Sequence, residues 1–277
     1  MTHGLVCAVC GGSTFRDRAV IWDELAEGWQ ITPAERAVVD RQQGTCCTGC
    51  GGNLRSIALA EAILGACGAA GTLEAFVASP AAASLRMLEI NEAGSLSPVL
   101  SRLPGHVLAT YPAVDMRAMP YGDASFDLIV HSDTLEHVPD PDRALAECAR
   151  VLHPSGALCF TVPVLPARLT RGRAELPAIY HGNAATMTED LRVQTDYGAD
   201  LWHAVHEAGF AAVILSRFSD GLAITATHAL RRSPLAQQDG TLARSAPSSG
   251  TLRRLIPAPV RRAARRLLPW PPNQSGR

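Results

Sequence analysis

The sequence predicts an α/β fold in which helices cover both faces of a parallel sheet, preceded by a small cysteine-bearing module. The run FDLIVH at 126–131 is short, apolar and rich in β-branched residues, as expected of a strand buried on both faces. A helix pattern and a second apolar strand follow it up to residue 163, which completes a βαβ unit. Two Cys-x-x-Cys sequences within the first 50 residues predict the additional module.

The N-terminal module is predicted from two cysteine pairs, each of which is followed by glycine. The pairs are Cys7 with Cys10, and Cys47 with Cys50. Small turning residues allow four thiolates to converge on one tetrahedral ion, so the sequence predicts a zinc-ribbon-like module with a structural Zn²⁺. Cys46 is a rival ligand, although only Cys47 stands in the Cys-x-x-Cys register. The alternative interpretation is a set of reduced thiols without metal.

Composition divides the chain into four parts. They are the zinc-ribbon-like module at 1–53, a linking helical region at 54–84, the α/β domain at 85–230 and a basic tail at 231–277. Thr32 followed by Pro33 predicts a helix start inside the module. The connection at 164–197 is long for a compact domain, and long connections are often functional, so we expect it to form a substrate lid.

The helix of the βαβ unit is predicted from its start, its apolar face and its end. Asp140 can accept an orphan backbone NH, and Pro141 suits the first helical position. Apolar residues then recur every three or four positions, at Ala144, Leu145, Cys148, Val151 and Leu152. Gly156 lies just past the predicted helix end, and the strand ALCFTVP follows. In such sheets, ligands bind at the carboxyl ends of the strands.

Three segments carry a resemblance to a known family. They are VDMRAMPYGDASFD at 114–127, LEHV at 135–138 and RVLHPSGALCFTVP at 150–163. Together they resemble the class I S-adenosylmethionine (SAM) dependent methyltransferases, in particular the methyltransferase type 11 group. The resemblance implies a Rossmann-like sheet over roughly residues 86–230, with SAM as cofactor. It also implies that Asp115 faces the adenine amino group and that the Met116 backbone NH faces an adenine ring nitrogen.

The part of the pattern that should hold the methionine end of SAM departs from the family. Family members carry an acidic residue and then a glycine-rich loop, whereas this chain has Glu89 followed by NEAGSLS, with Asn91 and Gly94. The next strand ends at Thr110, where the family has a ribose-binding carboxylate. The resemblance places all these residues at the cofactor, together with Ser132. The departures from the family pattern, in the loop and at Thr110, predict a cofactor pocket that is either reshaped or partly lost.

Candidates for acid–base chemistry lie after the central strand and in the predicted lid. His131, Asp133 and His137 stand at the predicted carboxyl end of FDLIVH, and His181 lies in the polar segment YHGN of the lid. Methyl transfer requires alignment of donor and acceptor and often a base, and histidine titrates near neutral pH. The alternative is that His137 is only a hydrogen-bonded turn residue and that Asp133 only orients a histidine.

Charge is distributed unevenly along the chain. All 25 basic residues are arginines, and ten of them lie in the tail beside a single acid, Asp239, so the remaining body is acidic. An acidic body argues against a nucleic-acid surface. The tail is predicted to be an extension in which 259–268 could form a basic amphipathic helix for a membrane surface or a protein partner. Without a signal peptide or an apolar span, we expect a cytoplasmic protein, with the inner face of the membrane as a candidate contact.

The predicted function is SAM-dependent methyl transfer to a small molecule, with a sugar or glycan precursor as the expected acceptor. That expectation comes from the resemblance of the module arrangement to sugar-modifying C-methyltransferases. One alternative is a noncatalytic zinc-bearing scaffold with a degenerate SAM fold. A second is an RNA methyltransferase, which the acidic body and the 5% aromatic content disfavour.

Overall fold

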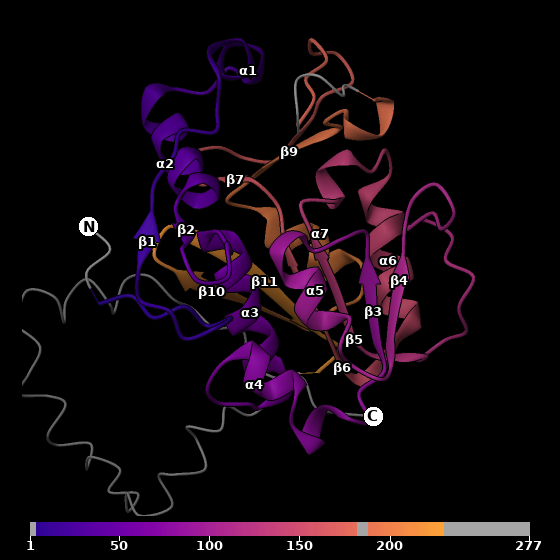
Figure 1. Cartoon of the computed structure of the whole chain (residues 1–277). Coiled ribbons are helices and arrows are strands. Elements are labelled where there is room, and N and C mark those ends of the chain that lie inside the picture. The colour runs from indigo at the N-terminus through magenta and orange to yellow at the C-terminus, as the bar shows by residue number, and fades with distance from the viewer. Residues whose placement is uncertain (1–3, 182–187, 230–277) are drawn as a thin grey trace, which may run out of the picture. The chain divides into compact units, whose positions relative to one another are not determined.

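The computed structural model describes residues 4–181 and 188–229 (Figure 1). Gly182 and Asn183 of the predicted lid, together with the whole predicted tail at 231–277, lie outside the described residues. The membrane or partner contact of the tail therefore stays a prediction. Within the described ranges, no helix is long and apolar enough to cross a membrane.

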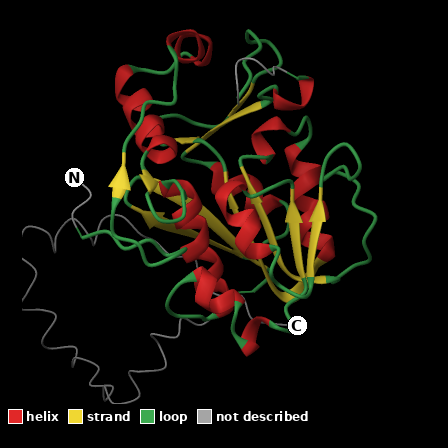
Figure 2. Cartoon of the chain, viewed as in Figure 1, coloured by secondary structure: helices red, strands yellow, loops and turns green. Residues whose placement is uncertain are grey.

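A six-stranded sheet forms the centre of the molecule, as the strand patterns predict (Figure 2). The strands lie in the order β10-β11-β6-β5-β3-β4, and β6, β5, β3 and β4 run parallel to one another. β11 runs antiparallel between β6 and β10. Their bounds are β3 Met87–Ile90, β4 His106–Ala109, β5 Phe126–Ser132, β6 Leu152–Thr161, β10 Ala212–Phe218 and β11 Gly221–Thr227. The predicted α/β class with a Rossmann-like parallel sheet is confirmed.

Helices cover both faces of this sheet because its strands carry apolar residues on both sides. Met87 packs with one group of helices and the adjacent Leu88 with the other, as the alternation of side chains along a strand dictates. One face is covered by α3 Leu54–Cys67, α4 Leu73–Val77 and α5 Ser97–Leu100, and the other by α6 Pro141–Val151 and α7 Leu201–Glu207. Short 3₁₀ helices complete the connections: η1 Pro80–Ala82, η2 Gly94–Leu96, η3 Leu135–His137 and η4 Glu189–Leu191.

The predicted helix starts are confirmed by their caps. Asp140 accepts a hydrogen bond from the Arg143 backbone NH at 3.2 Å, and α6 begins at the next residue, Pro141. In the N-terminal module, Thr32 and Glu35 form a capping box at the start of α2, Pro33–Gly44. Local sequence therefore determines where these two helices begin.

Helix α3 is a layer of the central domain. A Cβ atom added to Gly221 at the start of β11 would lie 2.1 Å from the Leu54 carbonyl oxygen, so only glycine permits this approach of helix and strand. The helix crosses β10, β11 and β6 on one face of the sheet. The predicted linking helix thus closes the core.

The connection from β4 to β5 spans residues 110–125 and contains no helix or strand. The spacing of Thr110 and Asp115 is too short for a helix, as the sequence predicts. β4 is consequently an edge strand, and Val107 and Leu108 stay 38% and 42% exposed. This connection delivers Asp115 directly to the carboxyl ends of the strands.

The N-terminal module and the predicted lid share a small apolar core. The module contributes β1 Phe15–Arg16, α1 Asp23–Trp29, α2 and β2 Cys46–Cys47, and the lid contributes β7 Val164–Leu165, β8 Arg171–Gly172 and β9 Thr195–Gly198. Ile21, Leu25 and Trp29 of the module pack against lid residues Leu165, Ile179 and Val193. Helices α1 and α2 and the lid strands therefore form one packed unit at the edge of the central domain (Figure 1).

Candidate functional site

A cavity of about 480 Å³ opens at the carboxyl ends of β3, β4 and β5. Parallel strands end at one edge of the sheet, so the segments that follow them meet there. The cavity is lined by Ile90–Glu92 at the end of β3 and by Ser132–Thr134 at the end of β5. Several residues between 111 and 117, in the connection after β4, and residues of η4 in the lid complete the lining. Its volume lies in the range of small-molecule and cofactor sites.

The structure brings four of the predicted cofactor residues together at this cavity. They are Asn91, Asp115, Met116 and Ser132. The other three predicted residues, Glu89, Gly94 and Thr110, do not line it. Ser132 is held by a 2.8 Å hydrogen bond between its hydroxyl and that of Thr161 at the end of β6.

Glu89 and Asn91 together shape the loop that replaces the glycine-rich loop. Asn91 adopts a left-handed backbone with φ of 55°, which asparagine tolerates better than most residues, so it takes the role of a glycine. Its side-chain oxygen accepts from the Tyr111 backbone NH at 3.0 Å. Glu89 is fully buried, accepts from the Ala93 backbone NH at 2.7 Å and lies 2.6 Å from His106 Nε2. Glu89 thus fixes the backbone of this loop through its hydrogen bond with Ala93.

Asp115 presents an ionised carboxylate to the cavity. Arg117 donates its backbone NH at 2.8 Å and its guanidinium at 2.7 Å to this carboxylate. The Arg117 side chain holds the pKa of the Asp115 carboxyl below its ordinary value, so the group is charged at neutral pH. An anionic oxygen is a strong acceptor for an amino group. Arg117 is not among the residues predicted from the sequence, although its position two residues after Asp115 in DMR could have revealed it.

The four predicted acid–base residues separate in the structure. Asp133 and His137 line the cavity, whereas His181 lines a second cavity. His131 is fully buried, stacks on Phe160 with ring centroids 4.7 Å apart and lines neither cavity. Burial lowers the pKa of His131 to about 4, so its ring is neutral at physiological pH.

Asp133 is held in an unusual backbone conformation by a buried arginine. Its φ of 48° lies in the left-handed region, and its Oδ1 atom pairs with Arg55 Nη1 at 2.9 Å. Arg55 belongs to α3, and its side chain is 2% exposed. The Thr161 hydroxyl also donates to Asp133 Oδ1, at 3.3 Å. Strained backbone at the end of a central strand is typical of functional sites, and it directs this carboxylate to the cavity.

Glu136 lies close to both candidate histidines and is not among the residues predicted from the sequence. Its side chain is 1% exposed, and its Oε1 atom is 3.8 Å from His137 Nε2 and 3.9 Å from His181 Nδ1. Burial by itself would raise the pKa of this carboxyl, but the two imidazoles outweigh burial and hold the pKa below its ordinary value. The residue directly precedes His137 in LEHV, which is the signal that could have found it.

The second cavity, of about 500 Å³, is lined by residues of the module and by His181 of the predicted lid. Its walls include Arg18, Trp22, Trp29 and His181. The His181 ring packs against Trp29 with centroids 4.8 Å apart, and against His137 with centroids 5.5 Å apart in an edge-on arrangement. The His137–His181 pair therefore forms a wall shared by the two cavities.

The four predicted metal ligands converge at the N-terminus. The sulfurs of Cys7, Cys10, Cys47 and Cys50 lie within 4.8 Å of one another. Cys7 is 3.6 Å from Cys50 and Cys10 is 3.7 Å from Cys47 between sulfurs, close to the roughly 3.8 Å that Zn–S bonds of about 2.3 Å give in a tetrahedron. Cys46 is outside this cluster, with its sulfur 3.8 Å from the Gln43 carbonyl oxygen.

The chemistry of the cysteine cluster fits a cation. Burial raises the pKa of the Cys7 thiol to about 11 in the absence of an ion. Thiolates crowded at these distances repel one another, and a divalent cation removes that repulsion. A Cβ atom on Gly12 would lie 3.0 Å from the Cys47 sulfur, so a small residue is needed beside the cluster. The arrangement fits the predicted structural Zn²⁺ and selects Cys47 over Cys46.

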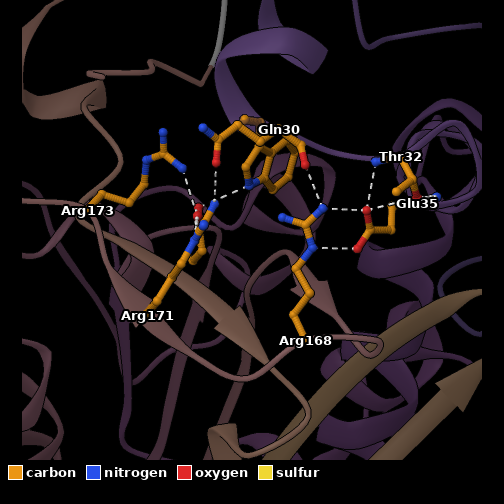
Figure 3. Close-up of polar contacts among 8 residues, drawn as sticks. Gln30, Thr32, Glu35, Arg168, Arg171 and Arg173 are labelled. Carbon is orange, nitrogen blue, oxygen red and sulfur yellow. Dashed lines mark hydrogen bonds and ion pairs between the residues drawn. The ribbon is translucent and has the colours of Figure 1, made fainter. Parts of the chain in front are cut away.

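A bidentate ion pair joins the module to the lid (Figure 3). Arg168 Nε and Nη2 each donate to a Glu35 carboxylate oxygen at 2.6 Å, and Nη2 also donates to the Gln30 carbonyl at 2.6 Å. Glu35 also accepts from the Thr32 backbone NH at 2.7 Å as part of the capping box. The Glu35 carboxylate thus caps the start of α2 and also binds Arg168 of the lid.

A second network is centred on Asp196 and includes Arg171 and Arg173, two residues that Figure 3 shows beside the Arg168–Glu35 pair. Trp29 Nε1 donates to Asp196 Oδ1 at 3.0 Å, and Arg173 and Arg171 donate to Oδ2 at 2.7 and 3.0 Å. The side chains of Arg173 and Asp196 are 2% and 4% exposed. Because Trp29 also packs on His181, this network connects the module to the wall between the cavities.

The Glu35 pair predicts a pH-dependent contribution to stability. Hydrogen bonds from Arg168 lower the pKa of Glu35 from 4.5 to about 2. A carboxyl whose pKa is lower in the folded state stabilises the fold above its ordinary pKa, and this contribution is lost as pH falls toward the lowered value. We expect Glu35→Gln to reduce the free energy of unfolding by about 2 kcal/mol at pH 7. Urea unfolding should show this difference narrowing below pH 4.5, and a difference independent of pH would contradict the prediction.

The chain is similar to methyltransferases in a family model and in individual proteins. The family model described as "Methyltransferase domain" matches residues 64–160. A protein of Mycolicibacterium smegmatis named "Probable S-adenosylmethionine-dependent methyltransferase" is 35% identical over 116 residues, which cover 38% of this chain and 44% of that protein. The 27-O-demethylrifamycin SV methyltransferase of Amycolatopsis mediterranei is 33% identical over 79 residues, which cover 27% of this chain and 29% of that enzyme.

Among solved structures, a SAM-dependent methyltransferase from Thermotoga maritima matches with a TM-score of 0.37 and 16% identity. The match covers 64% of this chain and 90% of the other. The chain spans less than half the length of the two curated relatives described above. The match to the family model includes β3 and β5, whose carboxyl ends open into the first cavity.

Proposed function

We propose that this chain, which carries a domain of the SAM-dependent methyltransferase type, transfers a methyl group from SAM to a small-molecule acceptor. The observation that carries the proposal is the cavity at the carboxyl ends of β3 and β5, where Asn91, Asp115, Met116 and Ser132 meet. Its position is the ligand site of open α/β sheets, and its volume suits a nucleoside-bearing cofactor. In this proposal, Asp115 accepts from the adenine amino group.

The retained loop shape favours cofactor binding over the scaffold alternative. The scaffold interpretation rests on missing glycines in NEAGSLS, yet Asn91 takes the left-handed backbone that a glycine would supply. Glu89 holds the Ala93 backbone NH, so the loop has a fixed path beside the cavity. The loop therefore keeps the backbone that a close approach of ligand requires.

The second cavity supports a ring-shaped, polar acceptor such as a sugar or glycan precursor. Indole rings offer flat apolar faces, and Trp22 and Trp29 supply two of them. Arg18 in the same lining offers charged donors that would suit an anionic group on such a precursor. We place the acceptor in this cavity, with its reacting atom directed at the His137–His181 wall.

The transfer itself needs alignment and removal of one proton from the acceptor. The acceptor attacks the sulfonium methyl carbon in line, the carbon–sulfur bond breaks, and S-adenosylhomocysteine leaves with the electron pair. The acceptor's proton has to leave at the wall between the cavities, where His137, His181 and Glu136 are close together. Asp133 lies on the cofactor side of this wall.

Substitution of Asp115 tests the proposal. We expect wild-type protein to bind SAM and S-adenosylhomocysteine saturably in calorimetry, and Asp115→Ala to weaken binding by about 10- to 100-fold, as expected for loss of a charged hydrogen bond. Asp123→Ala is the matched control, because Asp123 is 80% exposed and lies outside the cavity lining. Absence of saturable binding by the wild type at high micromolar ligand would refute the proposal and favour the scaffold.

A further inference from the structure

We propose that Glu136, His137 and His181 form a binding site for a borderline divalent metal ion such as Zn²⁺, separate from the four-cysteine cluster. One ligand atom from each residue lies within 4.8 Å of the others. Two imidazoles and one carboxylate form a ligand set used by both zinc enzymes and non-haem iron enzymes. Imidazole ligands favour zinc, iron, nickel or copper over magnesium and calcium.

The carboxylate of Glu136 is buried, and within the described ranges no arginine pairs with it, so only the two imidazoles, 3.8 and 3.9 Å from its Oε1 atom, offset its charge there. The side chain is 1% exposed, and neither carboxylate oxygen has a hydrogen-bond partner among the described residues. A buried carboxylate without a partner is strongly unfavourable. The buried guanidinium of Arg55 is paired with Asp133. A cation held between Glu136 and the two histidines would contact this carboxylate directly, which the imidazoles at these distances do not.

The tautomer of His137 also favours a cation at this position. Its Nδ1 atom lies 3.1 Å from the Arg192 carbonyl oxygen, which can only accept, so Nδ1 carries the proton. In a neutral ring, Nε2 then bears a lone pair, and this atom lies 3.8 Å from Glu136 Oε1. Two acceptors face each other at a distance too long for a hydrogen bond. A metal ion between them would satisfy both, and a backbone carbonyl on the opposite ring nitrogen is the usual support of a ligating histidine.

His181 completes the set from the lid. Its Nδ1 atom is 3.9 Å from the same Glu136 oxygen, and its Nε2 atom is buried without a partner among the described residues. The ring is held by Trp29, and the backbone NH of His181 donates to the Leu191 carbonyl at 3.1 Å. Tetrahedral donors at bond lengths of about 2.0–2.1 Å are roughly 3.4 Å apart. The two spacings to Glu136 therefore need to close by about half an ångström, and the two histidine nitrogens, which lie within 4.8 Å of each other, have to close to the same separation.

This site would connect the lid to the central sheet beside both cavities. Glu136 and His137 come from η3 after β5, and His181 comes from the lid. His137 lines the first cavity and His181 the second, so open coordination positions would be accessible to an acceptor. This catalytic role rests on the proposed methyl transfer: an acceptor hydroxyl bound to the ion loses its proton more readily. Metal binding itself does not depend on that function.

Cobalt binding to the full chain tests the site. Chelator-treated protein titrated with Co²⁺ should bind about two ions, one with the strong charge transfer of thiolate ligands and one with only the weaker bands of nitrogen and oxygen ligands. Glu136→Gln and His137→Gln should weaken the second ion by more than the roughly 10- to 100-fold that loss of an outer-shell partner costs. Both variants should retain the thiolate signal, which also reports an intact fold.

The matched control is His203→Gln, since His203 is 59% exposed on α7 and distant in sequence from the cluster. Binding of cobalt to the thiolates alone would overturn the inference. So would a second ion whose affinity is unchanged in Glu136→Gln and His137→Gln. SAM calorimetry on the same preparations separates the two proposals, because a protein that binds the second ion but not SAM retains the metal site and loses the proposed function.

Discussion

Cys47→Ser is expected to remove about one zinc ion per chain and to lower the thermal midpoint more than any other substitution considered for this protein. Binding of structural zinc contributes directly to folding, with apparent free energies of roughly 10–16 kcal/mol in zinc-finger peptides. Cys47 is fully buried within the four-sulfur cluster and also belongs to the core under α3. Loss of the ion should therefore loosen both the module and the adjoining helix. Elemental analysis and thermal unfolding measure the two effects.

The neighbouring residue provides the control for this substitution. Cys46→Ser changes the same chemical group one position away, but the Cys46 sulfur lies outside the cluster. Zinc content should be unchanged in Cys46→Ser. Equal zinc content in Cys47→Ser and the wild type would show that the ligand set is wrong, and loss of zinc in Cys46→Ser alone would reassign the ligand.

Asp196→Asn is expected to destabilise the protein by about 3–5 kcal/mol, the range for breaking a buried ion pair by removing one partner. The change keeps the shape of the side chain but leaves the Arg173 guanidinium charged and buried without its carboxylate. It also weakens the acceptor for the Trp29 indole NH. Urea unfolding measures the loss, and a red shift of tryptophan emission is expected if Trp29 becomes hydrated.

Two further variants distinguish an uncompensated charge from simple loss of packing. Asp123→Asn alters an ion pair whose carboxylate is 80% exposed, so little change is expected. The double substitution Arg173→Met with Asp196→Leu removes both buried charges and should recover much of the stability lost in Asp196→Asn. If the double variant is as unstable as the sum of the single ones, the ion pair is not the origin of the effect.

The parts of the fold that were predicted correctly have local causes. The start of α6 follows from Asp140 and Pro141, and the start of α2 follows from Thr32 and Glu35 in a capping box. The central strands follow from short apolar runs, which also predict helices on both faces. The predicted family resemblance is confirmed by the match of residues 64–160 to the methyltransferase model.

The parts that the sequence could not predict depend on contacts between distant segments. Trp29 and Asp196 are 167 positions apart, and nothing near either residue indicates that they meet. Likewise, His131 and His137 look equally suited to chemistry in the sequence, but β5 directs His131 into the core against Phe160. Glu136 was missed because its role depends on His181, which a separate segment brings to it. Burial and partners, rather than residue type, distinguish these positions.

The close contact of Gly221 with Leu54 has a consequence for how the chain folds during synthesis. Helix α3 is made early, yet the strands β10 and β11 that it covers are among the last described elements to leave the ribosome. At synthesis rates of about 5–20 residues per second, roughly 10–30 s pass between the synthesis of α3 and the synthesis of the strands that cover its apolar face. Chains that end before β10 would leave this face exposed, so incomplete products should be far more prone to aggregation than the finished protein.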